Sequence, residues 1–165
     1  AMSKRTEELA TRLEQGYAQL ASYAESLSAQ EWAALIPQEG RSVGVLVHHV
    51  ATMYPVEVGV AQIIANGQAV AGLTWDLVAD MNANHALEHA EPDRTATLEL
   101  LRSNGAAAAA ALRALTDAQL DTAVRNSLYG DAPLTLQFWL EDHQVSHSYK
   151  HLAAVKALAA VAQPA

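Results

Sequence analysis

The sequence predicts an all-α protein, a four-helix bundle with short extra helices. Glycine and proline are scarce, 8 and 5 of 165 residues, as expected where long helices are joined by short loops. Apolar residues recur at helical spacing over four long stretches, a pattern typical of helices that bury one face in a bundle. No stretch shows the alternation of a strand, so we expect no strands. The length fits one domain, which we expect to span residues 2–165.

The first half of the chain is predicted to hold two long helices. Leucines at helical spacing favour a helix over residues 6–27. The stretch Ser28-Ala-Gln-Glu31 resembles a capping box and predicts a short helix after it. Ser42 can cap a second long helix over residues 43–65. Pro55 lies inside this helix and is expected to kink it.

The connection to the third long helix is expected to contain a shorter helix over residues 75–89. The third long helix is predicted to begin at Thr95 or Thr97 and to end at Leu115. Its middle is an alanine run, Ala106–Ala111. We interpret this run as a close helix–helix contact that only small side chains permit.

The end of the chain repeats this organisation. Thr116-Asp-Ala-Gln119 resembles a second capping box and predicts another short helix. Residues 130–133, Gly-Asp-Ala-Pro, predict a turn. The fourth long helix is expected over residues 135–161.

Composition excludes several classes of function. A net charge of −8 argues against a nucleic-acid partner, which needs a basic surface. The sequence has neither a Lys/Arg cluster for an anionic membrane nor an apolar run of about 18 residues, so we expect no membrane association. The first residues lack the apolar segment of a signal peptide, and we expect a cytoplasmic protein. There are no cysteines, so disulfides and thiolate ligands are excluded and any thiol would be external.

Three histidines of the last predicted helix, His143, His147 and His151, are spaced i, i+4, i+8. Each step of four residues advances about 40° around the helix, so the three point roughly the same way. Leu136 and Leu140 share their line, which indicates that the line faces inward. Three buried imidazoles need three sets of partners, a need that a metal ion removes. Two imidazoles at i, i+4 on one helix can bind one ion. Spacing alone leaves open which pair binds.

Two adjacent histidines in the second long helix must face different directions, about 100° apart. His49 shares an apolar line with Val45 and Met53, whereas His48 lies on a small and polar line with Thr52. We therefore expect His49 to point into the core as a candidate metal ligand and His48 to point towards the periphery. That His49 is merely a packed core histidine stays an alternative.

A further H-x-x-x-H pair, His85 and His89, lies near the expected end of a helix. Histidines there interact favourably with the helix dipole. We expect these two side chains to cap the helix or lie at the surface. The pair is nevertheless the strongest competing location for a metal.

The stretch from Arg41 to Ala51 resembles the second-helix signature of the DinB/YfiT-like superfamily. In that signature a start similar to W-S-V leads to a histidine followed by an aliphatic residue. Here Ser42-Val43 match the start and His49-Val50 match the histidine step. Arg41 stands where tryptophan is usual.

The last helix resembles the superfamily's second signature, H-x-x-x-H, at His147 and His151, with Lys150 at the usual third histidine-adjacent position. The resemblance implies an up-down-down-up bundle, often a homodimer. It also implies a site for Zn²⁺ or Ni²⁺ formed by His49, His147 and His151. His143 is then a neighbouring or alternative ligand.

Three histidine ligands leave a coordination position open, as in catalytic zinc sites. We therefore expect a metal-dependent enzyme acting on a small-molecule substrate, either a hydrolase or a thiol-dependent S-transferase. The resemblance implies a low-molecular-weight thiol as a possible partner. Tyr54, Glu57, Glu141 and Asp142 are candidates for a base or a partner of the ligands. The alternative function is a non-catalytic, stress-related binding or dimerisation module with a vestigial or absent metal site.

Overall fold

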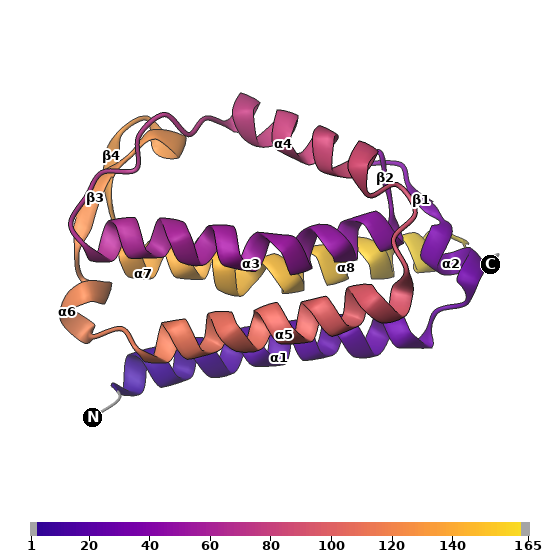
Figure 1. Cartoon of the computed structure of the whole chain (residues 1–165), viewed down its shortest axis with the longest axis horizontal. Coiled ribbons are helices and arrows are strands. Elements are labelled where there is room, and N and C mark those ends of the chain that lie inside the picture. Colours follow the sequence, from indigo (N-terminus) through magenta and orange to yellow (C-terminus); the bar gives the residue numbers. More distant parts are fainter. Residues whose placement is uncertain (1–2, 163–165) are drawn as a thin grey trace.

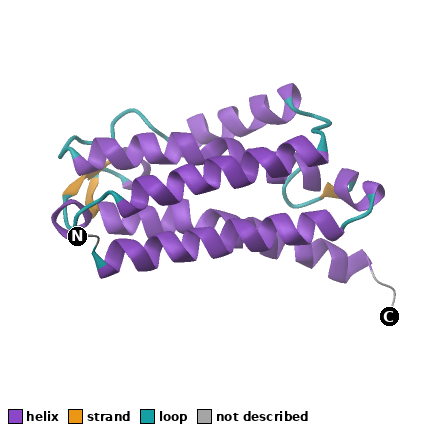
Figure 2. Ribbon diagram, turned by 60° about the horizontal axis from the view of Figure 1, so that its bottom comes forward, coloured by secondary structure: helices purple, strands orange, loops and turns teal. Residues whose placement is uncertain are grey.

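The computed structural model describes residues 3–162, and side chains up to residue 158. Four long helices, α1, α3, α5 and α8, lie side by side, and a further helix, α4, lies outside them over α3 (Figure 1; Figure 2). The expected domain limits, 2–165, extend beyond the described residues at both ends. The helices are α1 Lys4–Ser26, α2 Ala29–Ala33, α3 Val43–Ala65, α4 Trp75–Glu88, α5 Arg94–Arg113, α6 Asp117–Leu120, α7 Leu136–Trp139 and α8 Ser146–Ala162.

The helices follow the expected up-down-down-up order. Helices α1 and α8 run in one direction, and α3 and α5 run in the other (Figure 1). Helix α3 packs most extensively against α5, its parallel neighbour, and α1 packs against α5 and α8. Because α3 and α5 are parallel, the chain between them must return along the whole bundle. Helix α4 makes most of that return.

The predicted helix starts are confirmed at three positions. Ser28 and Thr116 each form a complete capping box, with Glu31 and Gln119 respectively. The Ser42 hydroxyl accepts the Val45 N–H at 3.1 Å and caps α3. Helix α3, which carries His48 and His49, therefore has a fixed first turn.

The alanine-rich stretch of α5 forms the predicted close contact. Ala108 and Ala109 are buried. One turn earlier, a Cβ added to Gly105 would lie 2.6 Å from a ring carbon of Tyr17 on α1. Small residues thus let α1 and α5 approach closely, and the aromatic ring fills the space over Gly105.

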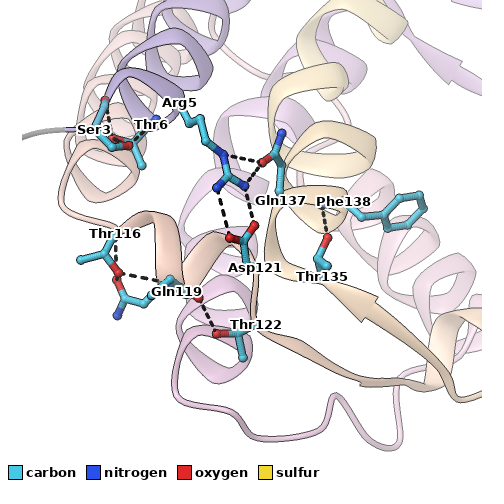
Figure 3. A network of polar contacts seen from close by, with 11 residues as sticks. Ser3, Arg5, Thr6, Thr116, Gln119, Asp121, Thr122, Thr135, Gln137 and Phe138 are labelled. Carbon is cyan, nitrogen blue, oxygen red and sulfur yellow. Dashed lines mark hydrogen bonds and ion pairs between the residues drawn. The ribbon is translucent and has the colours of Figure 1, made fainter.

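The end of the bundle where α1 begins is held by polar contacts (Figure 3). Arg5 of α1 donates to Asp121 at 2.7 Å and, through Nε, to Gln137 at 3.2 Å. Thr135 caps α7 by accepting the N–H of Phe138. These contacts fix where the last helical stretch begins relative to α1.

The prediction of no strands was wrong for two short antiparallel hairpins. Strand β1, Leu35–Ile36, pairs with β2, Arg41–Ser42. Strand β3, Ala123–Asn126, pairs with β4, Ala132–Thr135. Segments of two to four residues are too short to show an alternating pattern, which is why the sequence did not reveal them. The first hairpin delivers Arg41 to the start of α3.

The predicted helix over residues 135–161 is also not uniform. Between α7 and α8 the residues Leu140–Val145 form a π-helical segment. A π-helix places more residues in each turn than an α-helix, so it shifts the angular register of what precedes it. His143 lies in this segment, and the shared line with His147 and His151 expected from ideal α-helical spacing does not hold.

Helix α3 is, within the described residues, the one helix long and apolar enough by length and composition to cross a membrane. No apolar run of this length was expected from the sequence. Of its most apolar window, 56% is buried inside the bundle. Packing against α5 accounts for this composition, as in the core helix of a bundle.

Candidate metal centre

Three histidine rings from two helices meet at one point. His49 comes from α3, and His147 and His151 come from α8; their ligand nitrogens lie within 4.8 Å of one another. The Nε2 atoms of His49 and His147 are 3.2 Å apart. Two nitrogens bound to one tetrahedral zinc at about 2.0–2.1 Å lie about 3.3 Å apart. The two rings are therefore spaced as two ligands of one ion.

Burial keeps the rings of His49 and His151 neutral. His49 and His151 are each only 4% exposed. Burial lowers the pKa of His151 to about 2, with a further lowering by the neighbouring His147. Burial also lowers the pKa of His49 far below its ordinary value. Neutral imidazole is the form that binds a metal, so little free energy is needed to deprotonate these two ligands near pH 7.

Several polar atoms around this point have no hydrogen-bond partner within the described structure. They are the buried Nδ1 atoms of His147 and His151 and Oε1 of the buried Glu57. Glu57 Oε1 lies 3.5 Å from His147 Nδ1, just beyond a hydrogen bond. If the two side chains moved slightly closer together, the Nδ1–H of His147 could donate to the carboxylate of Glu57. The Nε2 lone pair of His147 would then face His49. A carboxylate behind a histidine ligand is a common feature of metal sites, so these residues fit a divalent ion.

The three rings line a pocket of about 470 Å³. Helices α3, α4 and α8 and the π-helical segment contribute its walls. Apolar and charged side chains are mixed, as in sites for small molecules. Besides the three histidines and Glu57, the lining includes Glu39, Arg41, Met53, Val60, Trp75, Val78, Met81, Trp139, Asp142, His143 and Lys150.

Arg41, which departs from the superfamily signature, lies in this pocket. Its side chain is 11% exposed, and Nη2 donates to Glu39 at 2.7 Å. Nη1 is buried and has no hydrogen-bond partner within the described structure. A guanidinium with a free donor suits an anionic group of a ligand.

His143 is held away from the three ligand rings. Its ring stacks on Trp139 at 4.0 Å between centroids, and Nε2 lies 2.5 Å from the Tyr129 hydroxyl. That hydroxyl also bonds Asp142. The groups of metal-ligating side chains found among the described residues do not include His143. It lines the pocket as part of its wall, and the alternative pairing of His143 with His147 is not assembled.

The other candidate polar residues have structural partners. Tyr54 is fully buried and hydrogen-bonded to Ser148, and burial raises its pKa well above the usual range. Glu141 forms an ion pair with Arg12 at 2.9 Å. Of the four residues considered as base or ligand partner, Glu57 is the one that lies within 3.5 Å of a ligand ring.

A second histidine group was predicted only in part, because the sequence placed a competing metal location at His85 and His89 but placed His48 at the periphery. His48, His85 and His89 bring their ligand nitrogens within 4.8 Å of one another. His89 is exposed and forms the C-cap of α4, as expected. His48, however, does not point to an empty periphery, because α4 returns along α3 and covers it. The sequence does contain a signal for this group. It has two adjacent histidines, His48 and His49, and two H-x-x-x-H pairs, His85/His89 and His147/His151.

Comparison with known proteins agrees with this architecture. A family model described as the DinB superfamily matches residues 12–155. The chain belongs to the DinB superfamily. Among solved structures it is similar to YfiT from Bacillus subtilis, described as a probable metal-dependent hydrolase with an unusual four-helix bundle topology. The TM-score is 0.77 at 22% identity, covering 96% of this chain and 88% of YfiT. The curated proteins gave no match.

The DinB assignment confirms the resemblance inferred from the two histidine signatures. The matched region begins within α1 and ends within α8, so it includes all three rings of the candidate centre. At 22% identity the likeness to YfiT establishes the fold. Metal binding and chemistry must therefore be argued from the residues of this chain.

Proposed function

We propose that this DinB protein is a metal-dependent enzyme in which His49, His147 and His151 hold one Zn²⁺ or Ni²⁺ ion. The observation that carries the proposal is the convergence of three imidazoles, two of them buried, in the wall of a pocket. Nitrogen ligands suit both ions. Three protein ligands leave room for a substrate or water.

The bound ion would supply a Lewis acid that lowers the pKa of a water or holds a thiolate. Glu57 orients His147 by accepting its Nδ1–H. Arg41 binds an anionic group of the substrate through its free Nη1. Trp75 and Met81 cover an apolar part of the substrate and reduce the access of water.

The reaction class we propose is hydrolysis or thiol-dependent S-transfer on a small molecule. The description of YfiT as a probable metal-dependent hydrolase favours the first. The absence of cysteine means that the second would use an external low-molecular-weight thiol. Both reactions need one open position on the ion and one nearby positive group, which the pocket offers.

A turnover screen tests the proposal. Zinc- or nickel-loaded protein without a His-tag is incubated with anionic esters, amides and electrophiles, each with and without a small thiol. We expect turnover with at least one class, and loss of that turnover in His147→Ala. The control is His143→Ala, which removes a pocket histidine outside the ligand group and should keep the metal. Stoichiometric metal without turnover in any class would favour the non-catalytic binding or dimerisation module.

Three expectations from the sequence remain proposals. We propose a homodimer, which sedimentation analysis would test. We also propose a cytoplasmic protein without a nucleic-acid or membrane partner, in keeping with the net charge of −8.

A further inference from the structure

The adjacent histidines of α3 divide between two groups of the same composition. His49 faces the pair His147/His151 on α8, and His48 faces the pair His85/His89 at the end of α4. Each group therefore combines one ring from α3 with two rings spaced i, i+4 on another helix. That spacing lets two imidazoles bind one ion.

The second group is tightly packed. His48 Nδ1 lies 2.8 Å from His85 Nε2. The centroids of the His48 and His89 rings are 4.3 Å apart, and those of His85 and His89 are 5.0 Å apart. One ligand nitrogen of each ring lies within 4.8 Å of the others, and rotation of the rings would be needed to place all three at about 2.0–2.1 Å from a common ion.

The hydrogen bond between His48 and His85 explains part of this packing, but it does not include His89. A favourable helix-dipole interaction can account for His85 and His89, but not for His48 on another helix. Between residues 3 and 158, no carboxylate forms an ion pair with any of the three rings. The buried Nδ1 of His85 has no hydrogen-bond partner there either. A cation shared by the three rings would be bound by one nitrogen of each.

Helix α4 has little else to hold it against the bundle. None of its residues is buried. Near its first turn, Trp75 Nε1 donates to the Leu128 carbonyl at 2.9 Å. Beyond its last turn, Trp32 Nε1 donates to the Pro92 carbonyl at 3.0 Å. Between these two anchors, the direct hydrogen bond from α4 to α3 is the one within the histidine group.

We propose that His48, His85 and His89 form a second divalent-metal site, which clasps α4 onto α3. Imidazole nitrogen favours Zn²⁺, Ni²⁺ or Cu²⁺ over Mg²⁺ or Ca²⁺. His89 is exposed, so this ion exchanges with solvent more readily than one held among the buried rings of the first site.

The clasp would act on the pocket. Trp75, Val78 and Met81 of α4 form its outer wall. The ring of His85 also lies 5.8 Å from that of His49, so the two groups are neighbours. Occupancy of the second site would therefore fix the outer wall while the first site stays open to a ligand. The second site stands independently of the reaction proposed above.

Zinc titration of metal-stripped protein without a His-tag tests the site. Binding is followed by calorimetry, and we expect the wild type to bind two equivalents of zinc. The pair variant His85→Ala/His89→Ala should lose the weaker equivalent and keep the tighter one. His147→Ala/His151→Ala should do the reverse, which separates failure of this proposal from failure of the first site. His143→Ala is the matched control and should keep both. A single equivalent in the wild type, or two in His85→Ala/His89→Ala, would overturn the proposal.

Hydrogen exchange tests the clasp. At free zinc 100 times the Kd of the weaker site, openings that separate α4 from α3 should become about 100-fold rarer. Zinc should therefore slow the hydrogen exchange of the α4 amides in the wild type and in His147→Ala/His151→Ala. It should not slow their exchange in His89→Gln. Because His89 is exposed, this last variant should fold as the wild type does. Equal exchange of α4 with and without zinc would refute the clasp.

Discussion

Replacing Glu57 by glutamine should move two properties in opposite directions. Glu57 is 4% exposed, and its Oε1 lacks a hydrogen-bond partner. A buried polar group without a partner destabilises a protein by about 1–3 kcal/mol, and more when it is charged. The amide of glutamine is itself buried, so we expect a gain near the lower end, about 1 kcal/mol. For a chain of this size, that raises the Tm of the metal-free protein by roughly 2–4 °C.

Metal affinity should fall in the same variant. The neutral amide is a weaker acceptor for the Nδ1–H of His147 than a carboxylate, so His147 is less well oriented and less basic. Losing such a partner lowers metal affinity about 10–100-fold, which corresponds to about 1.4–2.7 kcal/mol. Calorimetric titration with Zn²⁺ measures the affinity, and thermal unfolding with a chelator measures the Tm.

Glu141→Gln serves as the control, because Glu141 is partly exposed and pairs with Arg12 on α1. It should leave zinc affinity unchanged. If Glu57→Gln keeps the wild-type affinity, or lowers the Tm of the metal-free protein, the carboxylate does not act on His147 as argued.

Two further predictions concern the scaffold. Gly105→Ala places a methyl group against the ring of Tyr17 and should lower the Tm by roughly 2–12 °C, equivalent to about 1–3 kcal/mol of overpacking. Gly59→Ala, where an added Cβ meets nothing within 4 Å, should not lower it, and equal losses in both variants would refute the packing argument. The hydrogen bond from Arg113 holds the pKa of Glu14 below its ordinary 4.5. The contribution of this hydrogen bond to stability is therefore present above pH 4.5. It is lost as the pH falls through the lower pKa that Glu14 has in the folded state. Arg113→Met should lower the Tm at pH 7 and lose this effect at a pH well below 4.5; an effect that does not depend on pH would contradict the assignment.

Much of the fold could be predicted because the signals are local. Capping residues such as Ser42 act within one turn, and apolar periodicity shows which side of a helix is buried. The same periodicity correctly placed His49 inward. The topology came from the two histidine signatures of the superfamily rather than from periodicity.

The rest depends on contacts between distant segments. The π-helical segment that turns His143 away follows from how Leu140–Val145 packs, and no local pattern announces it. The second histidine group requires knowing that α4 returns along α3, because His48 and His85 are 37 residues apart. The placement of Arg41, with its unpartnered Nη1, likewise depends on a two-residue strand that is too short to read from the sequence.

The central claim is that His49, His147 and His151 hold a metal ion, and anomalous scattering from crystals soaked with Zn²⁺ tests it most directly. We predict an anomalous-difference peak at about 2.0–2.1 Å from one nitrogen of each ring, and no peak there in crystals of His147→Ala. A zinc peak only at other positions would contradict the account. The absence of a peak between the three rings after soaking with saturating zinc would contradict it too.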